Sequence, residues 1–488
     1  MGEAMHSWKV GRRVSVVLLL LFVNVPVAGA GGTAGHLGRV QASPGATVAR
    51  EPRRPQAFLL TAYNPPYAWH GPPYEDSAFL YYKNAGFDTL NWVRDEDALM
   101  DKVHQWGFRY FLDIRSLFPE LDPNGVDYLQ GVQYPEAGDE VANVAPEPVT
   151  EEMLHEVDRV VQKYRDDPNL IGYWICDEPY PAAYPNIATV VRRIRQEDPN
   201  PSHGCLINIG DDEYTTDENV EDFLNTTGVG VLCYDRYNFF NGYDRNDLYF
   251  ERLVMMRRHA LKHHIPFYNI VQAVGTNGTS VSWDSAGDGE HLDWRTPSPA
   301  EHRWLAYSSM AYGVHGIVWF HWDAADWGVV ENPDRDVIYP SLQSINAEIR
   351  SLGPVLFHLT TTHVEHTDTS AYDTDGGESV VRRVSDGVAL VVGSFKDEEG
   401  RQRYFMLMNK DFSNAVETEV TMRYRLHSLE VFNVNTSEWE AVAFENEADG
   451  GSFTVDLRAG GGKLFRFEGT LAADARGGTS GRTAPDPS

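Results

Sequence analysis

The 488-residue sequence has few cysteines, which limits how the chain can be held together. Only Cys176, Cys205 and Cys233 are present, and each lies inside an apolar run. An odd number of cysteines without Cys-x-x-Cys spacing argues against a disulfide framework and against a cysteine-based metal site. We therefore expect three small, buried hydrophobic side chains.

Positive charge is also scarce, since 41 Lys and Arg face 71 Asp and Glu, for a formal net charge of -30. Such a field repels polyanions, so we expect no nucleic-acid partner and favour a neutral one. No Gly-x-Ser-x-Gly, Walker-type or dinucleotide-binding motif stands in the right context, so we expect no cofactor. We attribute His259, His263 and His264 to a favourable interaction with a helix end rather than to metal binding, and predict no metal site.

Residues 1–30 are typical of a secretory signal peptide, with basic residues ahead of the apolar run 16–23 and small residues at 28–30. They predict a secreted or periplasmic protein without stable membrane insertion, or an anchored one if the signal stays uncleaved. Residues 31–55 are predicted to be a flexible lead-in and residues 471–488 a disordered tail.

Residues 56–354 alternate short apolar runs with segments of helical period, which indicates repeated β-α units. Eight strands and their intervening helices in this length predict a closed (β/α)8 TIM barrel, although an open doubly wound sheet gives a similar pattern. The strands are expected at 57–63, 89–93, 110–114, 170–176, 204–209, 230–234, 266–271 and 316–320, and helices at 151–164, 248–263 and 300–312.

Residues 355–470 lack helical signals and contain short strands separated by turns, which predicts a C-terminal all-β sandwich domain. Strands are expected at 388–394, 404–409, 417–422, 429–434 and 463–467.

Polar and aromatic residues gather where the barrel strands end, which is where barrels of this kind carry their chemistry. Carboxylates beside aromatic rings suit the cleavage of a glycosidic bond, because one acid protonates the leaving oxygen while rings pack against the sugar. The candidate substrate-binding residues are Tyr63, Asn64, Trp92, Asp113, Asn208, Tyr234, Gln272, Trp319, His321 and Trp322. Trp174 is a further candidate platform, unless it points outward.

The fourth run ends in the adjacent acids Asp177 and Glu178, followed by Pro179. Successive strand residues face opposite ways, so both acids enter a pocket only if the strand bends at its end, and Pro179 makes such a bend plausible. We favour Glu178 as the catalytic acid, with Asp177 as its orienting partner or a ligand-binding group. The alternative is an ordinary surface turn or helix cap.

Residues 57–355 resemble the clan A (β/α)8 glycoside hydrolases, a group that includes β-galactosidases and cellulases. The segment Gly172-Tyr-Trp-Ile-Cys-Asp-Glu-Pro matches the place of the clan's acid/base, and residues 306–322 are similar to its final helix and strand. The resemblance implies that Glu178 is the acid/base and that a nucleophilic glutamate ends strand seven. Here that position holds Gln272, whose amide cannot attack.

Three explanations for Gln272 remain open. Asp235 on strand six supplies the second carboxylate, the substrate's own acetamido group attacks, or the site only binds. We rank Asp235 first, although it could instead pair with Arg236 or Arg115. The sequence thus predicts a secreted glycoside hydrolase acting on an oligo- or polysaccharide, with Glu178, Asp177 and Asp235 as catalytic residues. The alternatives are a non-catalytic carbohydrate-binding barrel and a polysaccharide lyase with Tyr234 or Tyr237 as base.

Overall fold

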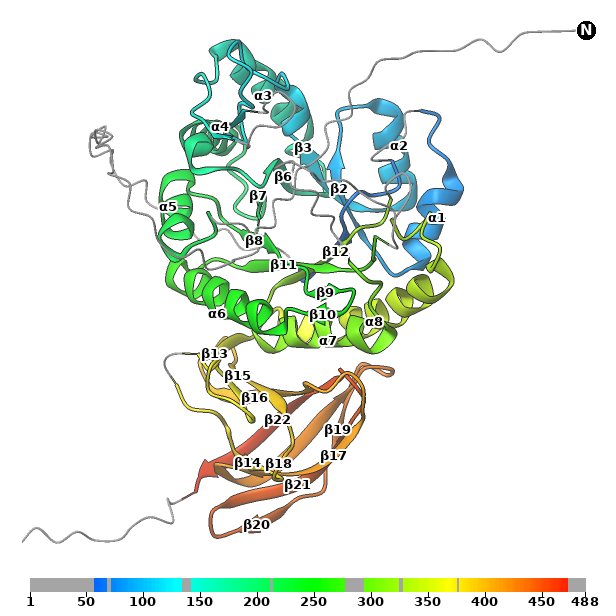
Figure 1. Cartoon of the computed structure of the whole chain (residues 1–488), viewed down its shortest axis with the longest axis vertical. Helices are drawn as coiled ribbons and strands as arrows, with labels where there is room; N and C mark the ends of the chain where they lie inside the picture. The colour runs from blue at the N-terminus through cyan, green and yellow to red at the C-terminus, as the bar shows by residue number, and fades with distance from the viewer. Residues whose placement is uncertain are drawn as a thin grey trace, which may run out of the picture.

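The computed structural model describes residues 57–67, 72–133, 142–210, 214–276, 294–323, 328–374 and 377–472. The predicted signal peptide, the lead-in and nearly all of the tail lie outside the described residues. A ring of strands and helices occupies one end of the molecule and a β-domain the other (Figure 1). None of the described helices is both long and apolar enough to cross a membrane.

Eight parallel strands form the ring, and each overlaps one of the predicted runs. They pair in the order β1-β12-β11-β8-β7-β6-β3-β2. From β2 to β12 each strand therefore lies beside the next barrel strand in the chain, and β1 pairs with the last one. The predicted TIM barrel is therefore confirmed. The strands are β1 (Leu59–Ala62), β2 (Thr89–Val93), β3 (Arg109–Asp113), β6 (Leu170–Asp177), β7 (Gly204–Ile209), β8 (Leu232–Asp235), β11 (Phe267–Gln272) and β12 (Gly316–Phe320).

The first and last strands of this sheet, β1 and β2, are joined by side chains. Thr61 Oγ1 donates a 2.8 Å hydrogen bond to the carbonyl of Thr89, and Asn91 Nδ2 donates a 3.3 Å bond to the carbonyl of Ala62. These contacts bring the two edges together, so the sheet is a near-closed barrel.

Helices surround the strands, and capping residues start several of them. Thr150 accepts a hydrogen bond from the backbone of Met153 at the start of α3, and Ser298 forms a capping box with Glu301 at the start of α7. The helices are α1 (Asp76–Asn84), α2 (Asp97–Trp106), α3 (Glu151–Tyr164), α4 (Tyr184–Glu197), α5 (Asp217–Thr227), α6 (Asn246–His263), α7 (Pro299–Ala311) and α8 (Arg335–Leu356). The short elements beside them are η1 (Arg115–Leu117), η2 (Pro181–Ala183), β4 (Val132–Gln133), β5 (Ala142–Asn143), β9 (Phe239–Phe240) and β10 (Tyr243–Asp244).

Two antiparallel sheets form the C-terminal β-domain, in the orders β13-β15-β16-β22-β18-β19 and β14-β17-β21-β20. Apolar side chains of both sheets, such as Phe405, Phe453 and Phe465, form one buried core between them, which is a sandwich. The strands are β13 (Thr360–His366), β14 (Val381–Val384), β15 (Leu390–Lys396), β16 (Gln402–Asn409), β17 (Val416–Met422), β18 (Tyr424–Asn433), β19 (Glu438–Ala441), β20 (Glu445–Glu447), β21 (Gly450–Leu457) and β22 (Gly462–Leu471).

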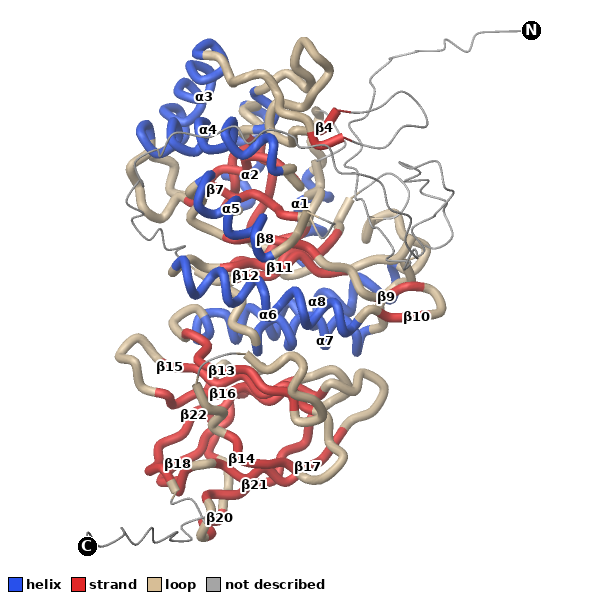
Figure 2. Tube along the Cα trace, turned by 60° about the vertical axis from the view of Figure 1, so that its left-hand side comes forward, coloured by secondary structure: helices blue, strands red, loops and turns tan. Residues whose placement is uncertain are grey.

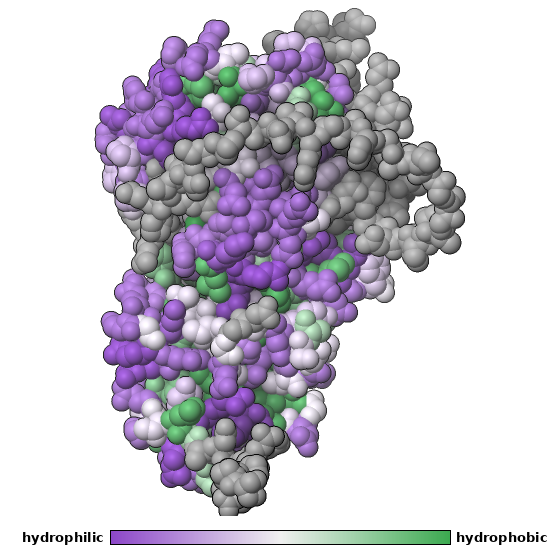
Figure 3. Space-filling view, turned by 90° about the vertical axis from the view of Figure 1, so that its left-hand side faces the viewer, coloured by the Kyte–Doolittle hydropathy of each residue, from purple (hydrophilic) through white to green (hydrophobic). Residues whose placement is uncertain are grey.

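The β-domain packs directly against α6, α7 and α8 (Figure 2). Arg458 bridges to Glu348 of α8 at 2.8 Å, and Trp304 of α7 donates a 3.1 Å hydrogen bond to the carbonyl of Lys410. A Cβ on Gly460 would lie 2.2 Å from the carbonyl oxygen of Ala300, so only glycine permits this approach. The face shown in Figure 3 is mostly hydrophilic, with hydrophobic residues in small separate patches.

The barrel interior holds a second apolar cluster, separate from the layer between strands and helices. It includes Tyr63, Trp174, Cys233, Tyr237 and Phe320. All three cysteines are buried and none is disulfide-bonded, as expected from the sequence.

Candidate functional site

Three acids stand at the carboxyl ends of β6 and β8, on the face that we call the barrel mouth. Asp177 is the last residue of β6, Glu178 follows it, and Asp235 is the last residue of β8. Strand β7 lies between β6 and β8, and it places Asn208 opposite Asp177 in register. We refer to Asp177, Glu178 and Asp235 as the mouth carboxylates. All are buried, with exposed fractions of 8%, 8% and 1%.

Two local distortions allow adjacent acids to share one site. The register of β6 against β7 shifts between Trp174 and Cys176, and Glu178 adopts a left-handed φ of 46°. The backbone N–H of Glu178 then donates a 2.9 Å hydrogen bond to the carbonyl of Asn208. The strand therefore bends at Glu178 itself rather than at Pro179. Left-handed non-glycine residues are costly and concentrate at functional sites.

Gly210 makes room for the side chain of Glu178. A Cβ on residue 210 would lie 3.0 Å from Cγ, Cδ and Oε1 of Glu178, which is tighter than nearly all such contacts. The end of β7 thus supports the backbone of Glu178 through Asn208 and leaves space for its carboxyl group through Gly210.

Burial shifts the proton affinities of two mouth carboxylates. It raises the pKa of Asp177 to about 6, although hydrogen-bonding groups of Tyr63 and Asn208 oppose the shift. Burial, reinforced by the charge of Asp177, raises the pKa of Asp235 to about 8, against the opposing effect of Tyr237 and Asn208. Burial and the neighbouring charge therefore favour the protonated form of Asp235 more than that of Asp177.

Tyr237 follows Asp235 by two residues and belongs to the apolar cluster of the barrel interior. Burial raises its pKa well above 10, and the charges of Asp235, Glu178 and Asp177 raise it further. Tyr237 is therefore electrostatically coupled to acids from the ends of both β6 and β8. Arg115 forms its ion pair with Asp127 instead of Asp235.

Aromatic rings line the same interior. The ring of Tyr63 lies edge-on to Trp92 at 4.5 Å and to Trp174 at 5.7 Å between centroids. Trp174 therefore points inward. Trp92 and Asn64 both have left-handed φ, of 55° and 52°, so the ends of β2 and β1 are distorted like the end of β6.

Several polar atoms at the mouth are buried without a hydrogen-bond partner among the described residues. They include Trp92 Nε1, Asn64 Oδ1 and Asp235 Oδ1. Buried polar atoms are nearly always satisfied in folded proteins, so such a group of atoms at one end of a barrel is suited to a polar ligand.

Asp113 and His321, both predicted to bind substrate, lie at the ends of β3 and β12. Asp113 is half-buried and accepts a 3.1 Å hydrogen bond from the backbone of Ser116, and burial raises its pKa. His321 is fully buried against Phe320, with 4.6 Å between ring centroids, and burial lowers its pKa to about 3. His321 is therefore a neutral group at physiological pH.

Three predicted binding residues face the helices instead of the interior. Trp319 donates a 2.8 Å hydrogen bond from Nε1 to Asn346 of α8, and Trp322 packs edge-on to Tyr82 of α1 at 5.0 Å. Tyr234 belongs to the same outer core. Tyr234 and Trp319 alternate with inward-facing residues of their strands, and Trp322 lies just after the end of β12. The structure therefore does not bring these three residues into the site.

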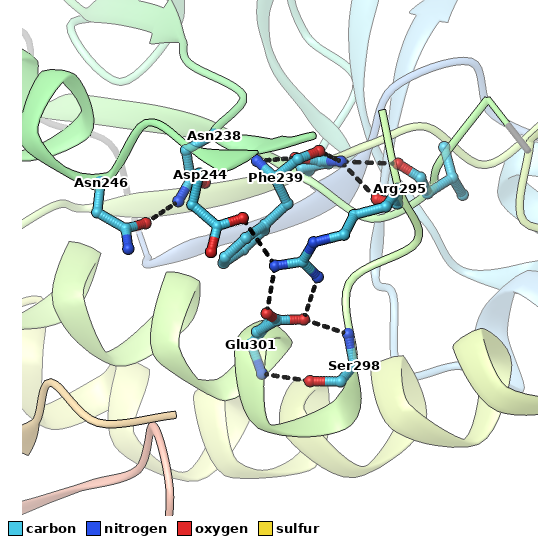
Figure 4. Close-up of polar contacts among 9 residues, drawn as sticks. Asn238, Phe239, Asp244, Asn246, Arg295, Ser298 and Glu301 are labelled. Carbon is cyan, nitrogen blue, oxygen red and sulfur yellow. Dashed lines mark hydrogen bonds and ion pairs between the residues drawn. The ribbon is translucent and has the colours of Figure 1, made fainter. Parts of the chain in front are cut away.

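Gln272 also stands outside the site, because its amide braces two loops. Its Oε1 accepts a 3.0 Å hydrogen bond from the backbone of Phe239, and its Nε2 donates to the carbonyls of Phe239, Val274 and Arg295 at 3.1, 3.2 and 2.9 Å. Arg295 in turn pairs with Glu301 and Asp244 (Figure 4). The amide at the end of β11 therefore connects the loops that contain Phe239 and Arg295.

Sequence reasoning missed Gly210, whose importance depends on where Glu178 lies in space, and gave no site role to Asn91. The left-handed backbone conformations of Asn64, Trp92 and Glu178 could not be predicted from the sequence, because none of these residues is glycine. Tyr237 was considered only as a base, whereas its position between acids on two strands makes it a central contact.

The chain is similar to several solved glycoside hydrolase structures. An α-L-fucosidase isoenzyme 2 from Paenibacillus thiaminolyticus is 10% identical, with 85% of this chain and 100% of that chain covered and a TM-score of 0.48. A family 30 subfamily 8 xylanase from Clostridium acetobutylicum is 12% identical, with 86% and 98% covered and a TM-score of 0.42. A family 27 β-L-arabinopyranosidase from Geobacillus stearothermophilus is 12% identical, with 78% of each chain covered and a TM-score of 0.38.

No protein-family model matches the sequence, and no curated protein matches it. Identities of 10–12% do not carry an activity from one protein to another, so the function must be inferred from the barrel mouth.

Proposed function

We propose that the chain is a glycoside hydrolase that cleaves O-glycosidic bonds of an oligo- or polysaccharide at the barrel mouth. The observation that supports this most is the position of three buried acids at the ends of β6 and β8, two of which are hydrogen-bonded to Asn208 of the strand between them. Hydrolysis of a glycoside needs one carboxyl group that donates a proton and one that is ionised, and Glu178 and Asp177 are our candidates for these two roles.

Glu178 is the proposed proton donor. Its backbone N–H is hydrogen-bonded to the carbonyl of Asn208, and Gly210 leaves space for its carboxyl group. In the reaction its proton passes to the glycosidic oxygen as the bond from that oxygen to the anomeric carbon breaks. Water adds to the anomeric carbon and its proton returns to the protein.

Asp177 is the better candidate for the ionised partner, in contrast to the ranking from sequence. The raised pKa of Asp235 keeps a proton on that side chain at neutral pH, and a protonated carboxyl group neither attacks nor stabilises a cation. Asp177 has the lower pKa of the two and accepts a hydrogen bond from Asn208. We assign Asp235 the task of keeping the second proton and orienting Asp177.

The lyase alternative finds less support. Tyr234 lies among the helices, and the raised pKa of Tyr237 opposes its use as a base. The binding-only alternative predicts that the protein binds a polysaccharide but releases no cleavage products from it.

A panel of aryl glycosides and polysaccharides, with analysis of products, tests the proposal. The Glu178→Gln variant keeps the size and burial of the side chain but has no acidic proton. We expect kcat to fall about 100- to 10,000-fold for a substrate that the parent cleaves. Glu152→Gln on the exposed face of α3 is the matched control and should cleave like the parent.

Equal rates for the parent and Glu178→Gln would refute the assignment of the acid. Binding of a polysaccharide by the parent, with no cleavage of any member of the panel, would favour the binding-only function instead. A product with new ultraviolet absorbance from a double bond would favour the lyase.

A further inference from the structure

Two histidines and two acids face one another between α5 and α6, in the helical layer outside the barrel strands (Figure 1). His259 and His263 are one turn apart on α6, and Asp217 and Glu221 are one turn apart on α5. His259 Nδ1 lies 3.2 Å from Glu221 Oε2, and His263 Nε2 lies 2.9 Å from the same oxygen. The helix dipole predicted from sequence does not account for this convergence.

We propose that His259, His263 and Glu221 form a binding site for a divalent transition metal ion of the zinc type. The candidate ligand atoms lie within 4.8 Å of one another. Ligand atoms about 2.1 Å from a tetrahedral ion lie about 3.4 Å apart, so the two short contacts need to open by only a few tenths of an ångström. Imidazole and carboxylate ligands suit zinc, copper and nickel better than calcium or magnesium.

A second observation that supports a metal site is the contact between the other ring nitrogen of His259 and Asp217. Nε2 of His259 lies 2.9 Å from Oδ1 of Asp217, so Nδ1 faces the proposed ion while Nε2 is held by a carboxylate. Metal-binding histidines commonly have this arrangement, because the outer carboxylate fixes the tautomer and orientation of the ring. A simple ion pair between helices does not need both nitrogens of the ring.

Nearby cations leave the proposed ligand atom accessible. Lys262 Nζ lies 2.9 Å from Glu221 Oε1, whereas both histidines approach Oε2. The side chain of Lys262 is 61% exposed and is free to move away.

Equilibrium dialysis of the untagged full-length protein against zinc, after treatment with a chelator, tests the site. We expect one tightly bound zinc per chain, little binding of magnesium, and a higher melting temperature with zinc. His263→Ala and Glu221→Gln should each weaken zinc binding at least 100-fold. Asp217→Asn should weaken it about 10- to 100-fold with the stoichiometry unchanged.

His264→Asn is the matched control, because His264 is the next residue and has a left-handed φ of 53° that asparagine tolerates. It should bind zinc like the parent. Failure of the parent to bind zinc at micromolar concentration, or equal binding by Glu221→Gln and the parent, would overturn the proposal. Melting curves without metal show whether each variant is folded, and activity toward glycosides is a separate measurement.

Discussion

Asn208 Nδ2 donates a 3.0 Å hydrogen bond to Oδ1 of Asp177 and thereby links the ends of β7 and β6 inside the barrel mouth. The same asparagine side chain opposes the rise in the pKa of Asp235, while its backbone carbonyl accepts the N–H of Glu178. Asn208, which has no ionisable group of its own, therefore positions Asp177 and the backbone of Glu178 and favours the ionised forms of Asp177 and Asp235.

Replacement of Asn208 by alanine is expected to raise the pKa of Asp177, because a donor to its ionised form is lost. Since hydrolysis in our proposal needs ionised Asp177, the acidic limb of the kcat/KM profile should move from near pH 6 to higher pH by about one unit. Measurement of kcat/KM between acidic and alkaline pH checks this. Asn433→Ala in the β-domain is the control, and an unchanged limb in Asn208→Ala would contradict the role of Asp177.

The Asp235→Asn variant is expected to be more stable than the parent at alkaline pH. The pKa of Asp235 is raised to about 8 in the folded state, so its contribution to stability is present below about pH 4 and is lost as pH rises through 8. Asparagine never becomes charged and avoids this loss, which is several kcal/mol at most because one pKa unit is about 1.4 kcal/mol.

Melting temperatures of the parent and Asp235→Asn near pH 5 and pH 9 measure this difference. The stabilising effect of the substitution should be larger at pH 9. Asp166→Asn, whose side chain is 92% exposed, should show no such pH dependence. A substitution effect of the same size at both pH values would show that Asp235 is not a buried titrating group.

The barrel could be predicted from sequence because each strand is a short apolar run with a clear boundary. The β-domain was harder, because β13, β14, β19, β20 and β21 were not predicted. Of these, β13 is rich in threonine and histidine and β21 begins with two glycines, so neither has the apolar character of a typical strand.

The sequence predicts which side chains face the barrel interior only where successive strand residues alternate between the two faces of the sheet. Asp235 and Cys233 face inward, so a period of two places Tyr234 outside, and the same argument places Trp319 outside between Val318 and Phe320. The joint entry of Asp177 and Glu178 depends on a register shift that no residue type signals.

Gln272→Glu, which restores the glutamate that the resemblance implies, is expected to destabilise the fold rather than to increase activity. Nε2 of Gln272 donates to three carbonyl groups, and a carboxylate would face these oxygens without a proton to give. The expected loss is about 2–4 kcal/mol, as for a buried charge without partners. Denaturant unfolding measures it, with the exposed Gln343→Glu as control. A more active and equally stable variant would return the end of β11 to the catalytic site.

Gly210→Ala tests the position of Glu178 without changing any polar group. The new methyl group would lie 3.0 Å from the carboxyl end of Glu178, so that side chain must move by a few tenths of an ångström. Because a misplacement of about 1 Å costs about 100-fold in rate, we expect kcat to fall about three- to tenfold while the melting temperature changes little. Gly461→Ala is the matched control, since its Cβ would find its nearest neighbour at an ordinary 3.4 Å. Unchanged kcat in Gly210→Ala, with Glu178→Gln inactive, would mean that the acid works from a position away from β7.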